Sequence, residues 1–164
     1  MTTLATATGL SLSTTTREIT RLVEAGLLTE ERIGRTRQVR ANSASRLDSV
    51  LRDLITLTYG PVPVLEAELA EVGGVRKAYV YGSWAARHEG VRGAEPNDVD
   101  VLVIGDADPD VLFDAADAAR RRLGLPVDIR RLSPHAWADP ASSDPFLSHV
   151  RSGPMVELDV KARA

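Results

Sequence analysis

The sequence contains no cysteine, which excludes disulfide bonds, thiolate metal ligands and cysteine nucleophiles. No apolar run approaches the ~20 residues that cross a bilayer, and the N-terminus lacks a basic segment followed by an apolar core. Internal repeats and low-complexity segments are also missing. These absences argue against disulfide-rich scaffolds and helical membrane proteins, and we expect a cytoplasmic protein without membrane contact.

What is present is typical of a globular chain, with 43% hydrophobic and 26% charged residues among 164. The charge is uneven. Residues 1–60 hold eight arginines against six acidic residues, whereas residues 61–164 hold twelve basic residues against seventeen acidic ones. Glycine and two prolines interrupt a helical pattern between Tyr59 and Pro63. We therefore predict two modules, residues 1–60 and 61–164, with different partners.

Apolar spacing, capping residues and turn residues predict the elements of both modules. In the front module we expect, in order, helices over residues 3–8 and 11–25, strands over 27–33 and 36–41, and a helix over 43–58. In the rear module we expect helices over 64–72, 84–88, 109–123 and 144–151, and strands over 76–81, 98–104, 126–132 and 155–158. This order is typical of an α+β fold with a single sheet.

Three aspartates in the rear module form a candidate metal site. Asp98 and Asp100 lie two residues apart at the start of a predicted strand, so their carboxylates share one face of the sheet. Two like charges at that distance repel each other unless a cation joins them. Asp128 stands between apolar residues on a later strand and can join the pair. Three oxygen ligands at one sheet end suit magnesium together with substrate phosphates.

Gly82 and Ser83 come where a predicted strand turns at once into a helix. Unpaired N–H groups and the positive end of the helix dipole favour phosphate at such a place. Glycine allows close approach, and the serine hydroxyl can reach a phosphate oxygen. Arg87, one helical turn further on, is placed to add a charged contact. The pattern therefore predicts that Gly82, Ser83 and Arg87 bind a nucleotide.

Together these residues give a specific resemblance. The segments Gly82–Arg87, Asn97–Val103 and Val127–Ile129 resemble the minimal nucleotidyltransferases of the DNA polymerase β superfamily, which share Gly-Ser, Asp-x-Asp on the next strand and a third acid on a later strand. The resemblance implies a nucleotidyltransferase-type mixed sheet with flanking helices. It also implies Asp98, Asp100 and Asp128 as catalytic and magnesium-binding residues. Two alternatives remain: three ordinary surface acids, or a decayed site that binds nucleotide without chemistry.

The front module looks like a winged helix-turn-helix, with residues 5–28 as the turn and recognition helix and a hairpin around Gly34 as the wing. The chain starts where a second helix would stand, so we expect a small, partial, N-terminally shortened version. Thr15 takes a position that is normally apolar, and Leu4, Leu22 and Leu51 need other cover. A homodimer through the helix over 43–58 would supply that cover.

On this reading residues 1–42 bind double-stranded DNA. Short hydroxyls and arginines suit base edges and phosphates in a major groove, and basic residues of a wing suit phosphate or the minor groove. The expected groove residues are Ser13, Thr14, Arg17 and Arg21, and the expected wing residues are Arg32, Arg35, Arg37 and Arg40. The alternative is a remnant that serves dimer contacts without DNA.

The sequence therefore predicts a magnesium-dependent enzyme that moves a nucleoside monophosphate from a nucleoside triphosphate, such as ATP, to a hydroxyl of a protein, an RNA or a small molecule. The winged helix would tether the enzyme to DNA or let it regulate its own operon beside a partner protein, as in toxin–antitoxin arrangements. The rival hypothesis is a DNA-binding transcriptional regulator whose rear domain only senses nucleotide.

Overall fold

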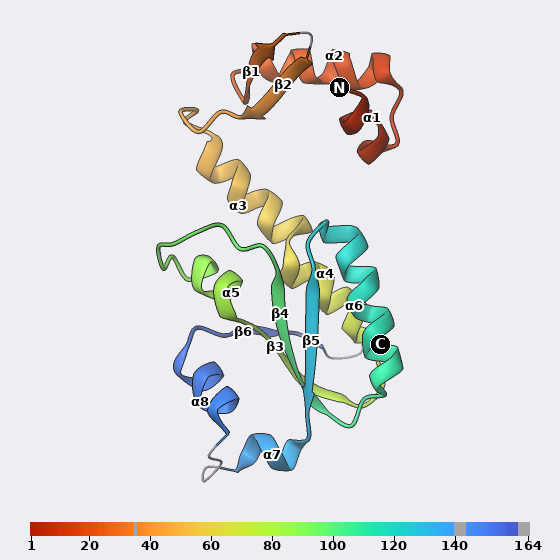
Figure 1. Ribbon diagram of the computed structural model, residues 1–164, viewed down its shortest axis with the longest axis vertical. Helices are drawn as coiled ribbons and strands as arrows, with labels where there is room; N and C mark the ends of the chain where they lie inside the picture. Colours follow the sequence, from red (N-terminus) through yellow and green to blue (C-terminus); the bar gives the residue numbers. More distant parts are fainter. Residues whose placement is uncertain (35, 140–143, 161–164) are drawn as a thin grey trace. The chain divides into compact units, whose positions relative to one another are not determined.

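A computed structural model describes residues 1–34, 36–139 and 144–160 (Figure 1). The chain divides into two compact units, residues 1–55 and 56–164. The division falls inside helix α3 (Asp48–Tyr59), a few residues before the segment at which the sequence suggested a boundary. Within the described ranges no helix combines the length and the apolar character that a membrane span requires.

The first unit contains two short helices and a hairpin ahead of α3. Its elements are α1 (Thr2–Thr8), α2 (Leu12–Glu24), β1 (Leu28–Ile33) and β2 (Thr36–Ala41). Ser11 caps α2, because its hydroxyl accepts a hydrogen bond from the Thr14 amide at 3.1 Å. The strands β1 and β2 pair antiparallel along their whole length. This order of elements agrees with the sequence-based expectation.

The third helix begins later than the sequence suggested. We expected a helix from residue 43, but residues 43–47 form turns and α3 starts at Asp48. The Asn42 side chain accepts a bond from the Ala44 amide at 3.2 Å and donates one to the Gly26 carbonyl at 2.8 Å. Such local side-chain bonds compete with the helical ladder for backbone groups, which explains the delayed start.

The first unit has very little core. Among its described residues only Ala5 and Thr15 are buried. The Thr15 hydroxyl donates to the Ser11 carbonyl at 3.0 Å, so this polar group does not remain unsatisfied at a position that is normally apolar. Of the leucines expected to need cover, Leu22 is exposed. Burial of apolar surface is the main stabilising term in folding, so little of it holds this unit together.

The second unit contains a sheet and the helices that flank it. Its elements are α4 (Pro61–Ala70), β3 (Val75–Tyr81), α5 (Gly82–His88), β4 (Val99–Gly105), α6 (Pro109–Leu123), β5 (Val127–Leu132), α7 (Pro134–Ala138), α8 (Pro145–Ser152) and β6 (Val156–Leu158). The sequence did not predict α7. Its five residues are too few for a periodic pattern. The feature that marks the start of this helix is the capping residue Ser133, whose hydroxyl accepts a hydrogen bond from the Ala136 amide.

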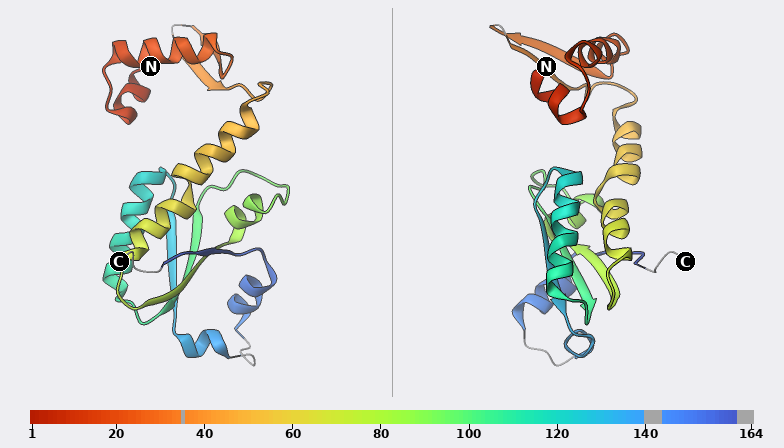
Figure 2. Two further views of the ribbon diagram at one scale, coloured as in Figure 1. Left: turned by 180° about the vertical axis from the view of Figure 1, so that it is seen from behind. Right: turned by 90° about the vertical axis from the view of Figure 1, so that its right-hand side faces the viewer.

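The strands form one mixed sheet in the order β5-β4-β3-β6. The pair β4–β5 is parallel, with α6 as the crossover, and β3 pairs antiparallel with both β4 and β6. The long strands β3, β4 and β5 are hydrogen-bonded neighbours, and the left view of Figure 2 shows this sheet from behind. The unit is therefore an α+β fold with a mixed sheet and flanking helices, as the sequence predicted.

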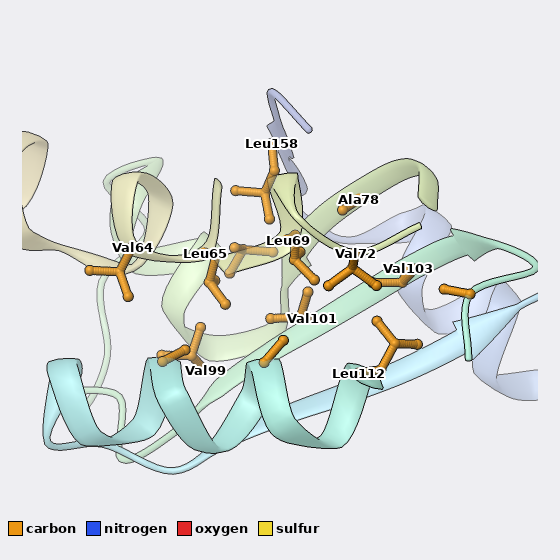
Figure 3. Packing of buried hydrophobic residues seen from close by; sticks show 14 residues of the cluster. Val64, Leu65, Leu69, Val72, Ala78, Val99, Val101, Val103, Leu112 and Leu158 are labelled. Carbon is orange, nitrogen blue, oxygen red and sulfur yellow. The ribbon is translucent and has the colours of Figure 1, made fainter. Parts of the chain in front are cut away.

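One face of the sheet packs against α4 and α6. Side chains from the two helices meet alternate residues of β4, as Figure 3 shows. The labelled members of this core on those three elements are Val64, Leu65, Leu69, Val99, Val101, Val103 and Leu112. Alternate residues of a strand point to opposite faces, so the even-numbered positions of β4 belong to the other side of the sheet.

That second face carries a smaller core. It contains Leu102 and Ile104 of β4 with Val150 of α8, all buried. Aromatic side chains from several elements pack against it: Tyr79, Tyr81, Trp137 and Phe146. Because Leu102 and Ile104 lie here, Asp100 shares their side of β4. The candidate acids therefore lie on the face that α7 and α8 cover.

Candidate functional site

Three polar residues stand in one row across the sheet. Asp100 of β4 pairs directly with Asp128 of β5 in the parallel ladder and with Tyr81 of β3 in the antiparallel one. Residues paired across a ladder project to the same face of a sheet. The row Tyr81–Asp100–Asp128 thus brings together residues that are far apart in the sequence, and Asp98 precedes it immediately before β4 begins.

The core sets the direction of Asp128. Its neighbours Val127 and Ile129 are half-buried against the α4/α6 side of the sheet. Alternation then directs Asp128 to the opposite side, where it is exposed. A shift of β5 by one residue would place both valine and isoleucine in water. Hydrophobic burial therefore fixes the register that aligns the two aspartates.

Gly82 lies against the Asp100 carboxylate. Its backbone φ is +73°, a region that favours glycine. A Cβ atom at this position would collide with the Oδ2 atom of Asp100. Glycine is thus favoured at the first residue of α5 for two reasons, the turn and the close approach. The strand-to-helix turn is held directly beside the acid row.

The acids influence one another electrostatically. Burial raises the pKa of Asp100 above its usual value, and the negative charges of Asp98 and then Asp128 raise this pKa further. The pKa of Tyr81 is also raised, first by burial and then by Asp100 and Asp128, while the positive charge of Arg130 lowers it. Asp98 and Asp128 therefore each lie close enough to Asp100 to repel its charge.

The donor set fits a magnesium ion in its chemistry. Carboxylate oxygens are the protein ligands that magnesium prefers, with a few of them completed by water and phosphate oxygens. Among the described side chains, no three His, Cys, Asp or Glu residues converge closely enough to form a metal cluster by themselves. Asp98 is exposed, so rotation of its side chain is unobstructed by burial. The strand ladder fixes the backbone positions of Asp100 and Asp128.

Ser83 and Arg87 occupy different surroundings. Ser83 is the second residue of α5 and is exposed, and Tyr81 at the N-cap provides no side-chain cap for that helix. Arg87 turns to the loop between α5 and β4, where its Nε atom donates to the Ala94 carbonyl at 3.1 Å and its Nη2 atom lies against Gly93. As placed, Arg87 holds the loop that leads to Asp98, and its contact with nucleotide stays a prediction.

The structure adds three residues to the site that were not predicted from the sequence: Tyr81, Arg130 and Phe146. Phe146 of α8 meets the ring of Tyr81 edge-on, with centroids 5.8 Å apart, and carries the Arg130 guanidinium 3.7 Å from its own centroid. Arg130 follows Asp128 by two residues, so the period of a strand could have placed it on this face. No sequence spacing connects Phe146 with the other two.

A groove runs beside the row along the edge of the sheet. Its volume is about 380 Å³, and it lies between α6 and β5. Asp128 lines it together with Phe113 and Arg120, and the Phe113 side chain is 73% exposed. Both walls carry apolar and charged residues, and the groove reaches the edge of the sheet at Asp128.

The predicted DNA-contacting residues of α2 are partly engaged within the first unit. The Ser11 hydroxyl lies 2.9 Å from the hydroxyl of Ser13 and donates to that of Thr14, also at 2.9 Å. Arg17 and Arg21 are exposed, and both approach Glu18, at 3.2 and 3.4 Å. Exposed ion pairs of this kind are weak, so both arginines can exchange partners.

The predicted wing residues differ more. Arg37 is mostly covered, forms an ion pair with Glu30 of the neighbouring strand and donates to the Thr20 hydroxyl of α2 at 3.3 Å. It therefore connects the hairpin to the helix. Arg32 and Arg40 are exposed on the hairpin. Arg35 lies outside the described residues.

Comparisons with known proteins give no family for this chain. No protein-family model matches the sequence, and a search of curated proteins found no significant match. Support for a function therefore comes from the site's own residues.

Proposed function

We propose that residues 79–131 form the catalytic core of a magnesium-dependent nucleotidyltransferase. The observation that supports this most strongly is the alignment of Asp100 with Asp128 on adjacent parallel strands, with Asp98 close enough to raise the pKa of Asp100. Grouped acids with unfavourable mutual repulsion are typical of cation-dependent active sites. Gly82 lies against Asp100, which supports a role for the turn at the start of α5 in binding the phosphates.

In the proposed reaction the oxygen of an acceptor hydroxyl forms a bond to the α-phosphorus of a nucleoside triphosphate. The bond between the α-phosphorus and the bridging oxygen breaks, pyrophosphate leaves, and the hydroxyl proton passes to the Asp128 carboxylate. Asp98, Asp100 and Asp128 would hold magnesium, which when bound supplies charge neutralisation for the triphosphate and polarises its α-phosphate. The chain's own task is to orient both partners.

Two sides of the acid row would receive the two substrates. Gly82 and Ser83 lie on the β3 side, where the α5 turn offers backbone N–H groups to the triphosphate. The acceptor would approach from the β5 side, where Asp128 is exposed at the edge of the sheet and the groove between α6 and β5 ends. In this arrangement Asp128 would contact the acceptor hydroxyl, and Asp98 and Asp100 would lie next to the nucleoside triphosphate.

Transfer of label tests the proposal directly. The full chain is incubated with magnesium, each of the four α-phosphate-labelled nucleotides and lysate of its own host, beside the variant Asp98→Ala/Asp100→Ala. We expect label on a protein, an RNA or a small molecule with the intact aspartates alone. Measurable nucleotide binding without any transfer would overturn the enzyme and leave a nucleotide sensor.

A DNA-binding regulator is the second candidate, and the exposed arginines of α2 and of the hairpin favour it. Arg17, Arg21, Arg32 and Arg40 put positive charge on helix and wing. Salt-sensitive DNA binding that survives Asp100→Ala would support this role, since each phosphate contact adds to the salt dependence. The apolar side chains Val50 and Leu57 of α3 are exposed, which supports a homodimer. Light scattering would measure the mass of that homodimer.

A further inference from the structure

Arg130 sits one step along β5 from the acid row. Its partner across the ladder is Leu102, and Asp128 is two residues before it on the same face. Leu102 belongs to the second core, so the backbone beneath Arg130 is held by buried neighbours. The side chain itself is exposed. The backbone of this cation is therefore fixed and its side chain is open to solvent, beside two candidate catalytic acids.

Phe146 fixes the orientation of this cation. The guanidinium carbon lies 3.7 Å from the ring centroid, within the range of a cation–π contact. The ring is held in turn by the edge-on contact with Tyr81 and by packing against the second core. A guanidinium that stacks on a ring through its flat face keeps its in-plane N–H donors available.

Those donors have no partner within the described part of the chain. There Arg130 forms neither an ion pair nor a hydrogen bond, although Asp128 is two residues away. Arg92, in the loop before β4, shares this lack of a partner, whereas the other described arginines of the second unit are engaged: Arg76 with Asp106, Arg87 with the Ala94 carbonyl, Arg120 and Arg121 with Asp117, Arg122 with Glu68, Arg131 with the Ala107 carbonyl and Arg151 with the Trp137 carbonyl. Arg130 thus differs from them in holding its donors open to a ligand.

We propose that Arg130, oriented by Phe146, is a phosphate-binding residue of the site, an inference that rests on the nucleotidyltransferase function proposed above. A planar guanidinium with open donors binds a phosphate through two parallel hydrogen bonds. The phosphate belongs either to the triphosphate donor or to the backbone of an RNA acceptor that approaches along the β5 side. Both sources present the same chemistry to Arg130.

Binding measurements on the full chain test the proposal without relying on activity. Inorganic tripolyphosphate, ATP and a short single-stranded RNA are each titrated calorimetrically in the presence of magnesium. The variants are Arg130→Gln, Arg130→Lys and Phe146→Leu. Arg76→Gln is the matched control, because Arg76 is an exposed arginine of β3 whose partner Asp106 lies 3.3 Å away on the surface.

We expect Arg130→Gln to weaken the binding of at least one phosphate ligand about tenfold or more. The affinity of Arg130→Lys should lie between those of Arg130→Gln and the unaltered chain. Arg76→Gln should leave the affinity unchanged. Loss for tripolyphosphate and ATP identifies the donor, whereas loss for RNA alone identifies the acceptor. Phe146→Leu keeps the charge but removes the stacking, so a several-fold loss is expected at unchanged melting temperature. If that variant melts early, the two Arg130 variants decide.

Unchanged affinity of Arg130→Gln for all three ligands would overturn the inference. If the same protein still transfers label from a nucleotide, only the role of Arg130 falls. If the unaltered chain binds none of the three ligands and transfers no label, the proposed function falls with it. The two failures are therefore distinguishable.

Discussion

The Asp100 carboxylate occupies the space that a side chain at position 82 would need, and Gly82 adopts a φ of +73° beside it. Backbone geometry and site geometry are therefore coupled through one contact. Gly90 offers a comparison, because its φ is +79° and an added Cβ would meet no atom within 4 Å.

Gly82→Ala should destabilise the protein more than Gly90→Ala. Both substitutions force an L-residue into the left-handed region, at a cost of about 1–2 kcal/mol. Gly82→Ala adds a collision with Asp100, which we expect to cost about 1–3 kcal/mol more. Chemical denaturation of both variants measures the difference.

A double-mutant cycle isolates that collision. In an Asp100→Ala background the Asp100 Oδ2 and carboxyl carbon are gone, while the remaining Cβ lies at an ordinary 3.6 Å from the added atom. The cost of Gly82→Ala should then fall to that of Gly90→Ala. A cost that stays the same in both backgrounds would show that the contact with Asp100 does not matter.

Asp100→Asn should stabilise the protein at neutral pH. Burial and the charges of Asp98 and Asp128 raise the pKa of Asp100 in the folded state. Its contribution to stability is therefore fully present below the unfolded pKa of about 3.9 and is lost as the pH rises through the folded pKa. The neutral amide avoids that loss.

We expect a gain of no more than about 1 kcal/mol at pH 7, because the site is open to solvent screening. The gain should shrink as the pH approaches 3. Thermal melts across this range, without added divalent ions, measure it. Asp114→Asn, at an exposed position of α6, is the control. A gain that is equal at pH 3 and pH 7 would contradict the role of charge repulsion.

Magnesium should reverse the order of stability. A ligand that binds the folded state stabilises it by about 2.7 kcal/mol at 100 times its Kd. We expect magnesium with a nucleoside triphosphate to raise the melting temperature of the unaltered chain and to leave that of Asp98→Asn/Asp100→Asn nearly unchanged. Chelation should remove the effect. Equal shifts in both proteins would place the binding elsewhere.

Arg87 gives a prediction that separates two roles. A Cβ at Gly93 would displace the Arg87 guanidinium from the loop, at little cost because the tip of this side chain is flexible. If Arg87 mainly holds the loop, Gly93→Ala and Arg87→Ala should both speed proteolysis of residues 89–98 and leave the KM for nucleotide similar. If Arg87 contacts nucleotide, Arg87→Ala alone should raise that KM, about tenfold.

The first unit should exchange its amide hydrogens faster than the second. Its described residues bury only Ala5 and Thr15, and regions with few buried apolar contacts open locally at low free energy. We expect protection in residues 1–55 to be at least about tenfold lower than in β4 and α6. Hydrogen exchange by mass spectrometry measures this. Equal protection would mean that another surface covers the exposed leucines.

Much of the fold could be predicted, because the signals were local. Apolar spacing and capping residues predicted a strand over residues 98–104 and a helix over residues 109–123, which the structure contains as β4 and α6. The site was less accessible. The alignment of Asp100 with Asp128 depends on how β5 returns after α6, and the contact of Arg87 with Ala94 depends on the path of a loop. Both are tertiary facts that no spacing contains.

Alternate residues of β5 face opposite sides of the sheet, which affects how the site tolerates mutation. Val127 and Ile129 hold the strand in register from one side, while Asp128 and Arg130 project from the other. A substitution in the hydrophobic wall that lets the strand slip would disable the acids without touching them. Asp128 and Arg130 are exposed, so their substitution should affect folding much less. In an evolving lineage the polar residues on this edge could therefore change quickly, whereas the hydrophobic residues that fix the register of β5 could not.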